Sequence, residues 1–141
     1  MRDLQKIILI YISATTVALM IVLAIFGARL EFLNGTSYGN ISVEQAKMLI
    51  ESDPSMVLVD VRTASEFSSG HVEGAVNLCV CDEEELLHNL EPRDAILVYC
   101  LSGTRSLKAM MILNENGYSK VYNMLGGIIE WIEKDYPVIE G

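Results

Sequence analysis

Two kinds of hydrophobic pattern divide this chain into two parts. Residues 7–28 form an unbroken apolar run without a charged residue, proline, asparagine or glutamine. From about residue 38 onward, short apolar runs alternate with segments in which apolar residues recur at the spacing of a helix face. The first pattern is typical of a segment inside a membrane, and the second is typical of a folded globular domain.

The apolar run is long enough to cross a bilayer. At about 1.5 Å per residue, a helix over residues 7–28 spans roughly 33 Å, against about 30 Å of hydrocarbon. The alternative is a cleaved signal peptide. The run is longer than the usual apolar core of such a peptide, and Ile25 and Phe26 stand where cleavage needs small residues. We therefore predict one uncleaved transmembrane helix.

The charges beside this run predict its orientation. Arg2 and Lys6 precede it, and Arg29 is the only cation that follows closely. Because cationic residues favour the cytoplasmic side, we expect a single-pass membrane protein whose folded domain lies outside the cytoplasm. The predicted organisation is a flank at residues 1–6, a membrane helix at 7–28, a linker at 29–37 and a folded domain at 38–141.

Strand and helix signals alternate within the folded part. Ser42 with Gln45, and Thr63 with Glu66, have the spacing of helix-opening capping boxes, and Asp82 is a third helix cap. The predicted strands cover residues 56–60, 75–78, 95–99 and 121–124, and the predicted helices lie near 42–52, 63–70, 82–90, 107–117 and 128–134. This alternation predicts an α/β fold with a mainly parallel sheet between helices, which binds ligands beyond the carboxyl ends of its strands.

Charge and cysteine content exclude some classes of protein. Asp plus Glu is 19 and Lys plus Arg is 10, so the net charge of −9 argues against nucleic acid as a partner. The 3 cysteines are an odd number, which makes a small fold stapled by disulfides a poor interpretation.

The loop after the apolar strand at 95–99 holds the candidate chemistry. It begins at Cys100, continues through Leu101, Ser102, Gly103, Thr104 and Arg105, and opens a helix. Backbone N–H groups of such a loop, together with the helix N-terminus, form a site for an anion. We expect a thiolate at Cys100, with Arg105 as the cation that closes the ring. The alternative is that Cys100 is a small buried hydrophobe at the end of a strand.

Several motifs, in a fixed order, resemble those of rhodanese-like proteins, a family of the sulfurtransferase superfamily. They lie at residues 60–62, 66–67, 70–77, 100–106, 125–127 and at Trp131. The resemblance covers about residues 38–140, which is nearly all of the predicted folded domain.

The resemblance implies a five-stranded sheet and an enzyme without metal or cofactor. In such enzymes Cys100 would take a sulfane sulfur from thiosulfate or a persulfide, bound by loop residues 101–105, and pass it to a thiol, cyanide or a carrier protein. Leu101 stands where thiosulfate-specialised relatives often have a cation, so a persulfide donor is at least as good a prediction as thiosulfate. We expect the domain to be a monomer.

Two other functions are compatible with parts of the sequence. Cell-cycle phosphatases of similar fold have a cysteine–arginine loop one residue longer, and the shorter ring from Cys100 to Arg105 suits sulfur transfer better. The second alternative is a non-catalytic module at the membrane that binds a partner or senses sulfur or redox state. A pure binding module needs neither Cys100 nor Arg105, so their presence together favours the enzyme.

Two further groups have weaker claims. Asp60, Arg62, Glu66 and His71 are expected to form a supporting network beside the site, rather than to supply His71 as a general acid or base.

Cys79 and Cys81 could resolve a persulfide, form a redox pair or, with His88, hold a metal. The interpretation that we favour is that both cysteines only pack as small residues.

Overall fold

The computed structural model describes residues 16–22 and 38–141. The chain divides between Ser37 and Tyr38 into two units, which are described separately. Residues 16–22 are helical and exposed. Within the described ranges, no helix is long and apolar enough to cross a membrane. The predicted flank and linker, and most of the predicted membrane helix at 7–28, lie outside the described residues.

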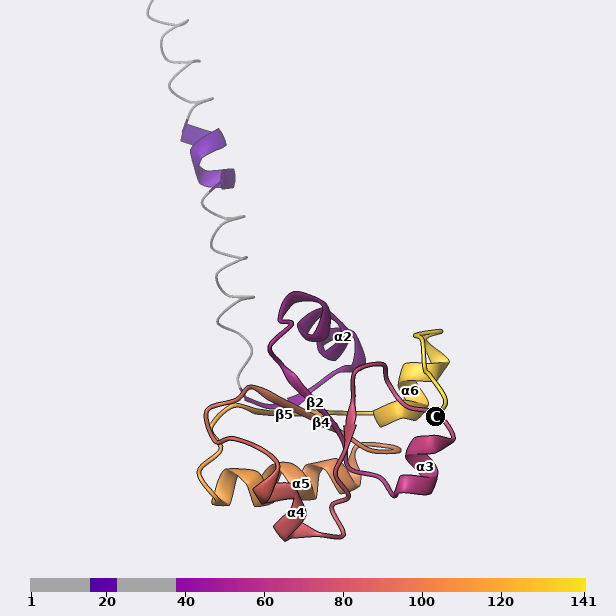
Figure 1. Ribbon diagram of the computed structural model, residues 1–141. Coiled ribbons are helices and arrows are strands. Elements are labelled where there is room, and N and C mark those ends of the chain that lie inside the picture. The colour runs from indigo at the N-terminus through magenta and orange to yellow at the C-terminus, as the bar shows by residue number, and fades with distance from the viewer. Residues whose placement is uncertain (1–15, 23–37) are drawn as a thin grey trace, which may run out of the picture. The chain divides into compact units, whose positions relative to one another are not determined.

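Five parallel strands form the sheet of the second unit (Figure 1). Their order across the sheet is β1 (Gly39–Ile41), β5 (Val121–Met124), β4 (Ile96–Tyr99), β2 (Val57–Asp60) and β3 (Val76–Asn77). This is the five-stranded parallel sheet that the resemblance implies. The predicted strands at 56–60, 75–78, 95–99 and 121–124 are all present, although β2, β3 and β4 are shorter than predicted.

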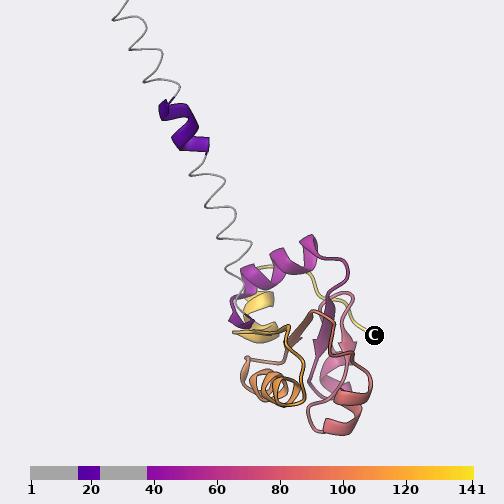
Figure 2. The same ribbon diagram turned by 90° about the vertical axis from the view of Figure 1, so that its left-hand side faces the viewer.

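Helices cover both faces of the sheet. Figures 1 and 2 show α2 (Val43–Ser52) on one face and α5 (Thr104–Glu115) on the other. The remaining helices are α3 (Ala64–Ser68), α4 (Glu83–His88) and α6 (Gly127–Glu133). The capping boxes at Ser42 and Thr63 and the side-chain cap at Asp82 are confirmed.

Strand side chains alternate between two cores, as expected for a sheet buried on both faces. In β4, Ile96 and Val98 pack with α4 and α5, whereas Leu97 and Tyr99 pack with α2 and α6. Cys100 continues this alternation and joins the core on the α4 and α5 side. The alternation therefore fixes the face of the sheet toward which the sulfur points.

Candidate active site

A glycine allows the chain to pass from β4 into α5 within a few residues. Gly103 caps α5 with a φ of 99°, in the left-handed region that favours glycine. A Cβ atom there would lie 3.3 Å from both the Met124 carbonyl oxygen and the Leu125 Cα. The loop is therefore held closely against the end of β5.

The N-terminus of α6 holds the same loop from a second direction. The Ile128 N–H donates to the Cys100 carbonyl at 2.9 Å, and the Ile129 N–H donates to the Leu101 carbonyl at 3.2 Å. Gly127 has a φ of 58°, and a Cβ there would lie 2.5 Å from each of those two carbonyl oxygens. Only glycine fits this contact, so residues 125–127 serve as a support for the cysteine loop.

Hydrogen bonds converge on the sulfur of Cys100. The Gly103 N–H donates to Sγ at 3.2 Å, and the Ser106 hydroxyl donates at 3.5 Å. Burial raises the pKa of the thiol, because only 1% of Cys100 is exposed. Hydrogen bonds from the Ser106 hydroxyl and from the N–H groups of Ser106, Ser102 and Gly103 outweigh burial, and the pKa lies below the ordinary thiol value. The loop therefore favours the thiolate, which is the nucleophilic form of cysteine.

Arg105, the cation expected to close the ring, forms an ion pair with Glu66. Its guanidinium donates two hydrogen bonds to the Glu66 carboxylate, at 2.8 and 2.6 Å. Glu66 also accepts hydrogen bonds from the N–H and the hydroxyl of Thr63. The Arg105 hydrogen bonds are the main cause that lowers the pKa of Glu66 to about 2. The charge beside the loop is thus a neutralised pair.

Asp60 and Arg62 form a second pair, apart from Glu66. Arg62 donates from Nε and from a terminal nitrogen to the Asp60 carboxylate, the shorter bond being 2.6 Å. It also donates to the Gly70 carbonyl at 2.7 Å. The Asn77 amide donates to the carbonyls of Asp60 and Arg62, each at 2.9 Å. These bonds join β2, β3 and the loop before His71. The carboxylates of the predicted network therefore form two hydrogen-bonded pairs, Asp60 with Arg62 and Glu66 with Arg105.

His71 is occupied by structural contacts. Its ring stacks on Phe67 with 3.6 Å between ring centroids, and Nδ1 lies 3.0 Å from the Phe67 carbonyl oxygen. Its backbone pairs with Ile139 through two hydrogen bonds of 2.9 Å. The contacts favour the interpretation of His71 as a residue that fixes the C-terminal segment rather than as an acid or base.

The surface around the loop is apolar. Leu101, Leu125 and Ile129 are 41%, 46% and 44% exposed. Ser102 and Thr104 are also exposed, whereas Gly103 is buried. This apolar rim, defined as Leu101, Leu125 and Ile129, was not predicted as a unit, because its members come from two segments of the chain that are more than 20 residues apart.

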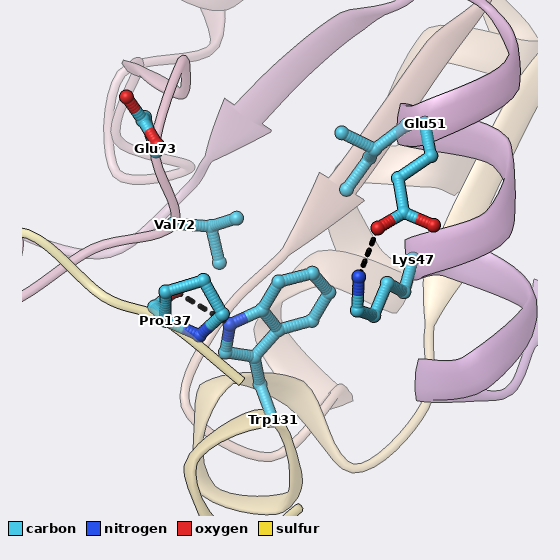
Figure 3. A pocket seen from close by; sticks show the side chains of 7 residues that line it. Lys47, Glu51, Val72, Glu73, Trp131 and Pro137 are labelled. Atoms are coloured by element: carbon cyan, nitrogen blue, oxygen red, sulfur yellow. Dashed lines mark hydrogen bonds and ion pairs between the residues drawn. The ribbon is translucent and has the colours of Figure 1, made fainter. Parts of the chain in front are cut away.

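A pocket of about 300 Å³ lies away from the cysteine loop. It is lined by Lys47, Ile50, Glu51, Val72, Glu73, Trp131 and Pro137 (Figure 3). The Trp131 indole N–H donates to the Pro137 carbonyl at 2.9 Å, and Lys47 pairs with Glu51. Trp131 is 3% exposed, so it belongs to the core while one side of it borders the pocket. None of the loop residues 100–105 lines this pocket.

Cys79 and Cys81 are joined as a disulfide, and Cys100 is a free thiol. The two residues therefore do not pack as separate small side chains, which corrects the favoured interpretation. Among the described residues, no group of three or more histidine, cysteine or acidic side chains is arranged to hold a metal.

Comparison with known proteins agrees with this architecture. The rhodanese-like domain family matches residues 42–134. Thiosulfate sulfurtransferase 18 of Arabidopsis thaliana is 39% identical over 113 residues, covering 70% of this chain and 82% of that protein. Thiosulfate sulfurtransferase GlpE of Shewanella oneidensis is 34% identical over 101 residues, covering 70% and 96%. YrkF of Bacillus subtilis is 33% identical over 101 residues, which cover 72% of this chain, and the chain spans 55% of that protein's length.

A solved structure has the same fold. The crystal structure of a rhodanese-related protein from Thermoplasma volcanium superposes with a TM-score of 0.66 at 28% identity, covering 74% of this chain and all of the other. The fold and the cysteine loop define a single sulfurtransferase-type domain. The chain belongs to the rhodanese-like family.

Proposed function

We propose that the protein is a sulfurtransferase that carries sulfane sulfur as a persulfide on Cys100. The observation that carries this proposal is the convergence of the Gly103 N–H and the Ser106 hydroxyl on the Cys100 sulfur. The similarity to proteins named thiosulfate sulfurtransferase supports the same reaction class.

The reaction has two halves. In the first, the Cys100 thiolate attacks the sulfane sulfur of a donor, a sulfur–sulfur bond forms on Cys100, and the donor leaves as sulfite or as a thiolate. The N–H groups of the loop then stabilise the negative terminal sulfur. In the second half, a thiolate, cyanide or a protein acceptor attacks that terminal sulfur. The Cys100 thiolate leaves and is ready for the next donor.

We propose a persulfide in preference to free thiosulfate as the natural donor. Glu66 neutralises Arg105, the nearest guanidinium of the loop, so the site offers little net charge to a dianion. The apolar rim and the net charge of −9 also disfavour a free dianion as the donor. In a persulfide, the atoms next to the sulfane sulfur are a thiol sulfur and its carbon rather than a charged sulfonate, and these can lie against the apolar rim.

We also propose that residues 7–28 anchor the protein in a membrane as a single-pass helix, with residues 38–141 as a monomeric domain outside the cytoplasm. The absence of charge in that run supports the proposal. So do Val17 and Met20 in the described helical part, which are 58% and 70% exposed. Membrane fractionation of the full chain and protease access in intact cells test the anchor and the orientation separately.

A cyanide-dependent thiocyanate assay tests the sulfur transfer. The full chain is given thiosulfate or glutathione persulfide as donor, and Cys100→Ser is expected to reduce thiocyanate formation with both to the rate seen without protein. Cys79→Ser/Cys81→Ser is the matched control and is expected to keep it. Thiocyanate formation by Cys100→Ser above the protein-free rate would overturn the proposal. The non-catalytic binding module would then account for the fold.

A further inference from the structure

The Cys79–Cys81 disulfide lies at the surface in the turn between β3 and α4. Cys81 is exposed and Cys79 is partly exposed, whereas Val80 between them is buried. The disulfide is therefore partly exposed to solvent, while Val80 anchors the turn to the core. External thiols can reach such a disulfide, since exchange requires direct attack on a sulfur atom.

The backbone places this disulfide at the same edge of the sheet as Cys100. The Val80 N–H donates to the Val61 carbonyl at 3.2 Å, and the Val61 N–H donates to the Tyr99 carbonyl at 2.9 Å. Val80 and Cys100 also share one buried core. Two strand spacings, or roughly 10 Å, separate the two backbone segments. The backbone segments that carry the two sulfur centres are therefore separated by a single intervening strand.

A backbone hydrogen bond distinguishes the two cysteines. The Cys81 N–H donates to Cys79 Sγ at 3.3 Å. This bond stabilises negative charge on the Cys79 sulfur, which makes Cys79 the better leaving group when the disulfide is attacked. Cys81, which is the more exposed, is then the sulfur that meets an external or incoming reactant.

We propose that Cys79 and Cys81, in their dithiol form, are a second sulfur centre that reduces the Cys100 persulfide and releases sulfide. This step rests on the sulfur transfer proposed above. The Cys81 thiolate attacks the terminal sulfur of the persulfide, a bond forms between them, and Cys100 leaves as its thiolate. The Cys79 thiolate then attacks Cys81 Sγ, which closes the disulfide and expels hydrosulfide.

The electrons balance between the two centres. Two thiols are oxidised to one disulfide, and one sulfane sulfur is reduced to sulfide. An external dithiol reduces the disulfide again by attack at Cys81. The persulfide extends the reach of Cys100 by about 2 Å. Transfer within one molecule requires the turn that carries Cys81 to approach Cys100 in the dithiol form, and the dependence of the rate on protein concentration tests it.

A single-turnover measurement on the full chain tests this step. The chain is reduced, freed of reductant, loaded with glutathione persulfide and desalted. We expect about one sulfide per loaded Cys100, loss of alkylation at Cys79 and Cys81, and a first-order rate that does not depend on protein concentration. Cys79→Ser/Cys81→Ser is expected to retain the sulfane sulfur and to give about one thiocyanate per loaded Cys100 with cyanide, whereas the unaltered chain gives less because it has released that sulfur as sulfide.

The single variants separate the two chemical steps. In Cys79→Ser the sulfur is expected to move to Cys81 and stay there, as an adduct of about 32 Da on that residue. In Cys81→Ser it is expected to stay on Cys100. These outcomes distinguish a sulfur relay from a disulfide that only stabilises the turn.

Two results would overturn the step alone. One is equal sulfide release from Cys79→Ser/Cys81→Ser, and the other is a release rate that rises with protein concentration. A Cys100 that takes no sulfane sulfur from any donor overturns the sulfur transfer itself, and this step with it. Thiocyanate formation from loaded Cys79→Ser/Cys81→Ser therefore shows which of the two proposals has failed.

Discussion

Two carboxylate–guanidinium pairs lie near the carboxyl ends of the strands, and they differ in their exposure to water. The side chains of Asp60 and Arg62 are 0% and 5% exposed, whereas those of Glu66 and Arg105 are 31% and 38% exposed. Both pairs have two-point hydrogen bonds with a shortest distance of 2.6 Å. Geometry alone therefore does not distinguish their roles.

The difference in burial indicates that the buried pair has a structural role and that the half-exposed pair acts on the donor. A buried pair cannot lose one member without leaving an uncompensated charge in the core, so Asp60 and Arg62 fix the fold. A half-exposed pair contributes little to stability, because water screens its attraction. Glu66 and Arg105 instead determine how much positive charge an anionic donor meets beside Cys100.

The largest expected effect is on stability, from Asp60→Ala. Arg62 would be left buried without its carboxylate, and we expect the free energy of unfolding to fall by roughly 3–5 kcal/mol. Denaturant unfolding of the full chain, followed by circular dichroism, measures it. The control is Glu51→Ala, which breaks the exposed pair with Lys47 and should cost less than about 1 kcal/mol. Equal losses in the two variants would contradict the comparison.

Arg105→Ala is expected to act on rate more than on stability. It removes the cation and leaves the Glu66 carboxylate unpaired, which repels a dianion. We expect the thiosulfate reaction to slow by about tenfold, the persulfide reaction to slow less, and stability to change by less than about 1 kcal/mol. Single-turnover loading of Cys100 with each donor measures the ratio. Equal slowing with both donors would show that Arg105 acts by shaping the loop rather than by charge.

Glu66→Gln is expected to shift donor preference in the opposite direction. Glutamine keeps the capping-box bonds with Thr63, because its side-chain oxygen still accepts. It frees the Arg105 charge for the donor. We expect a two- to fivefold faster thiosulfate reaction, by roughly 0.2–1 kcal/mol. A slower thiosulfate reaction would mean that Glu66 is needed to hold Arg105 in place.

The smallest expected effect is a pH dependence of the exposed pair. The pKa of Glu66 lies at about 2 in the folded protein, against an ordinary value of 4.5. A lowered folded-state pKa stabilises the protein above about pH 4.5, and this contribution is lost as the pH falls toward about 2. The difference in unfolding free energy between the unaltered chain and Glu66→Gln should therefore shrink over that range. A difference independent of pH would contradict the assignment.

Most of the fold could be predicted because the hydrophobic pattern reports burial directly. The strands β2 and β4 are apolar runs, and Ser42 and Thr63 supply local capping bonds. The strand β1 was missed. Gly39 and Asn40 have weak strand propensity, and only pairing with β5 makes this segment extended.

The active-site loop could be predicted in part, because its glycine and its position after β4 are local features. The Glu66–Arg105 pair joins residues 39 positions apart, and it depends on how α3 docks against the loop. The Cys79–Cys81 disulfide needs a bent backbone with 5.1 Å between the two Cα atoms, which hydrophobic spacing does not report. Long-range docking and local bends were therefore the features that the sequence did not reveal.

The central claim is that Cys100 carries the transferred sulfur, and mass spectrometry of the loaded chain tests it most directly. To keep the sulfur in place, the measurement uses Cys79→Ser/Cys81→Ser after treatment with glutathione persulfide and removal of excess donor. The account predicts an adduct of about 32 Da on the peptide that contains Cys100, and its removal by cyanide. An unmodified Cys100 peptide, or an adduct that cyanide does not remove, would contradict it.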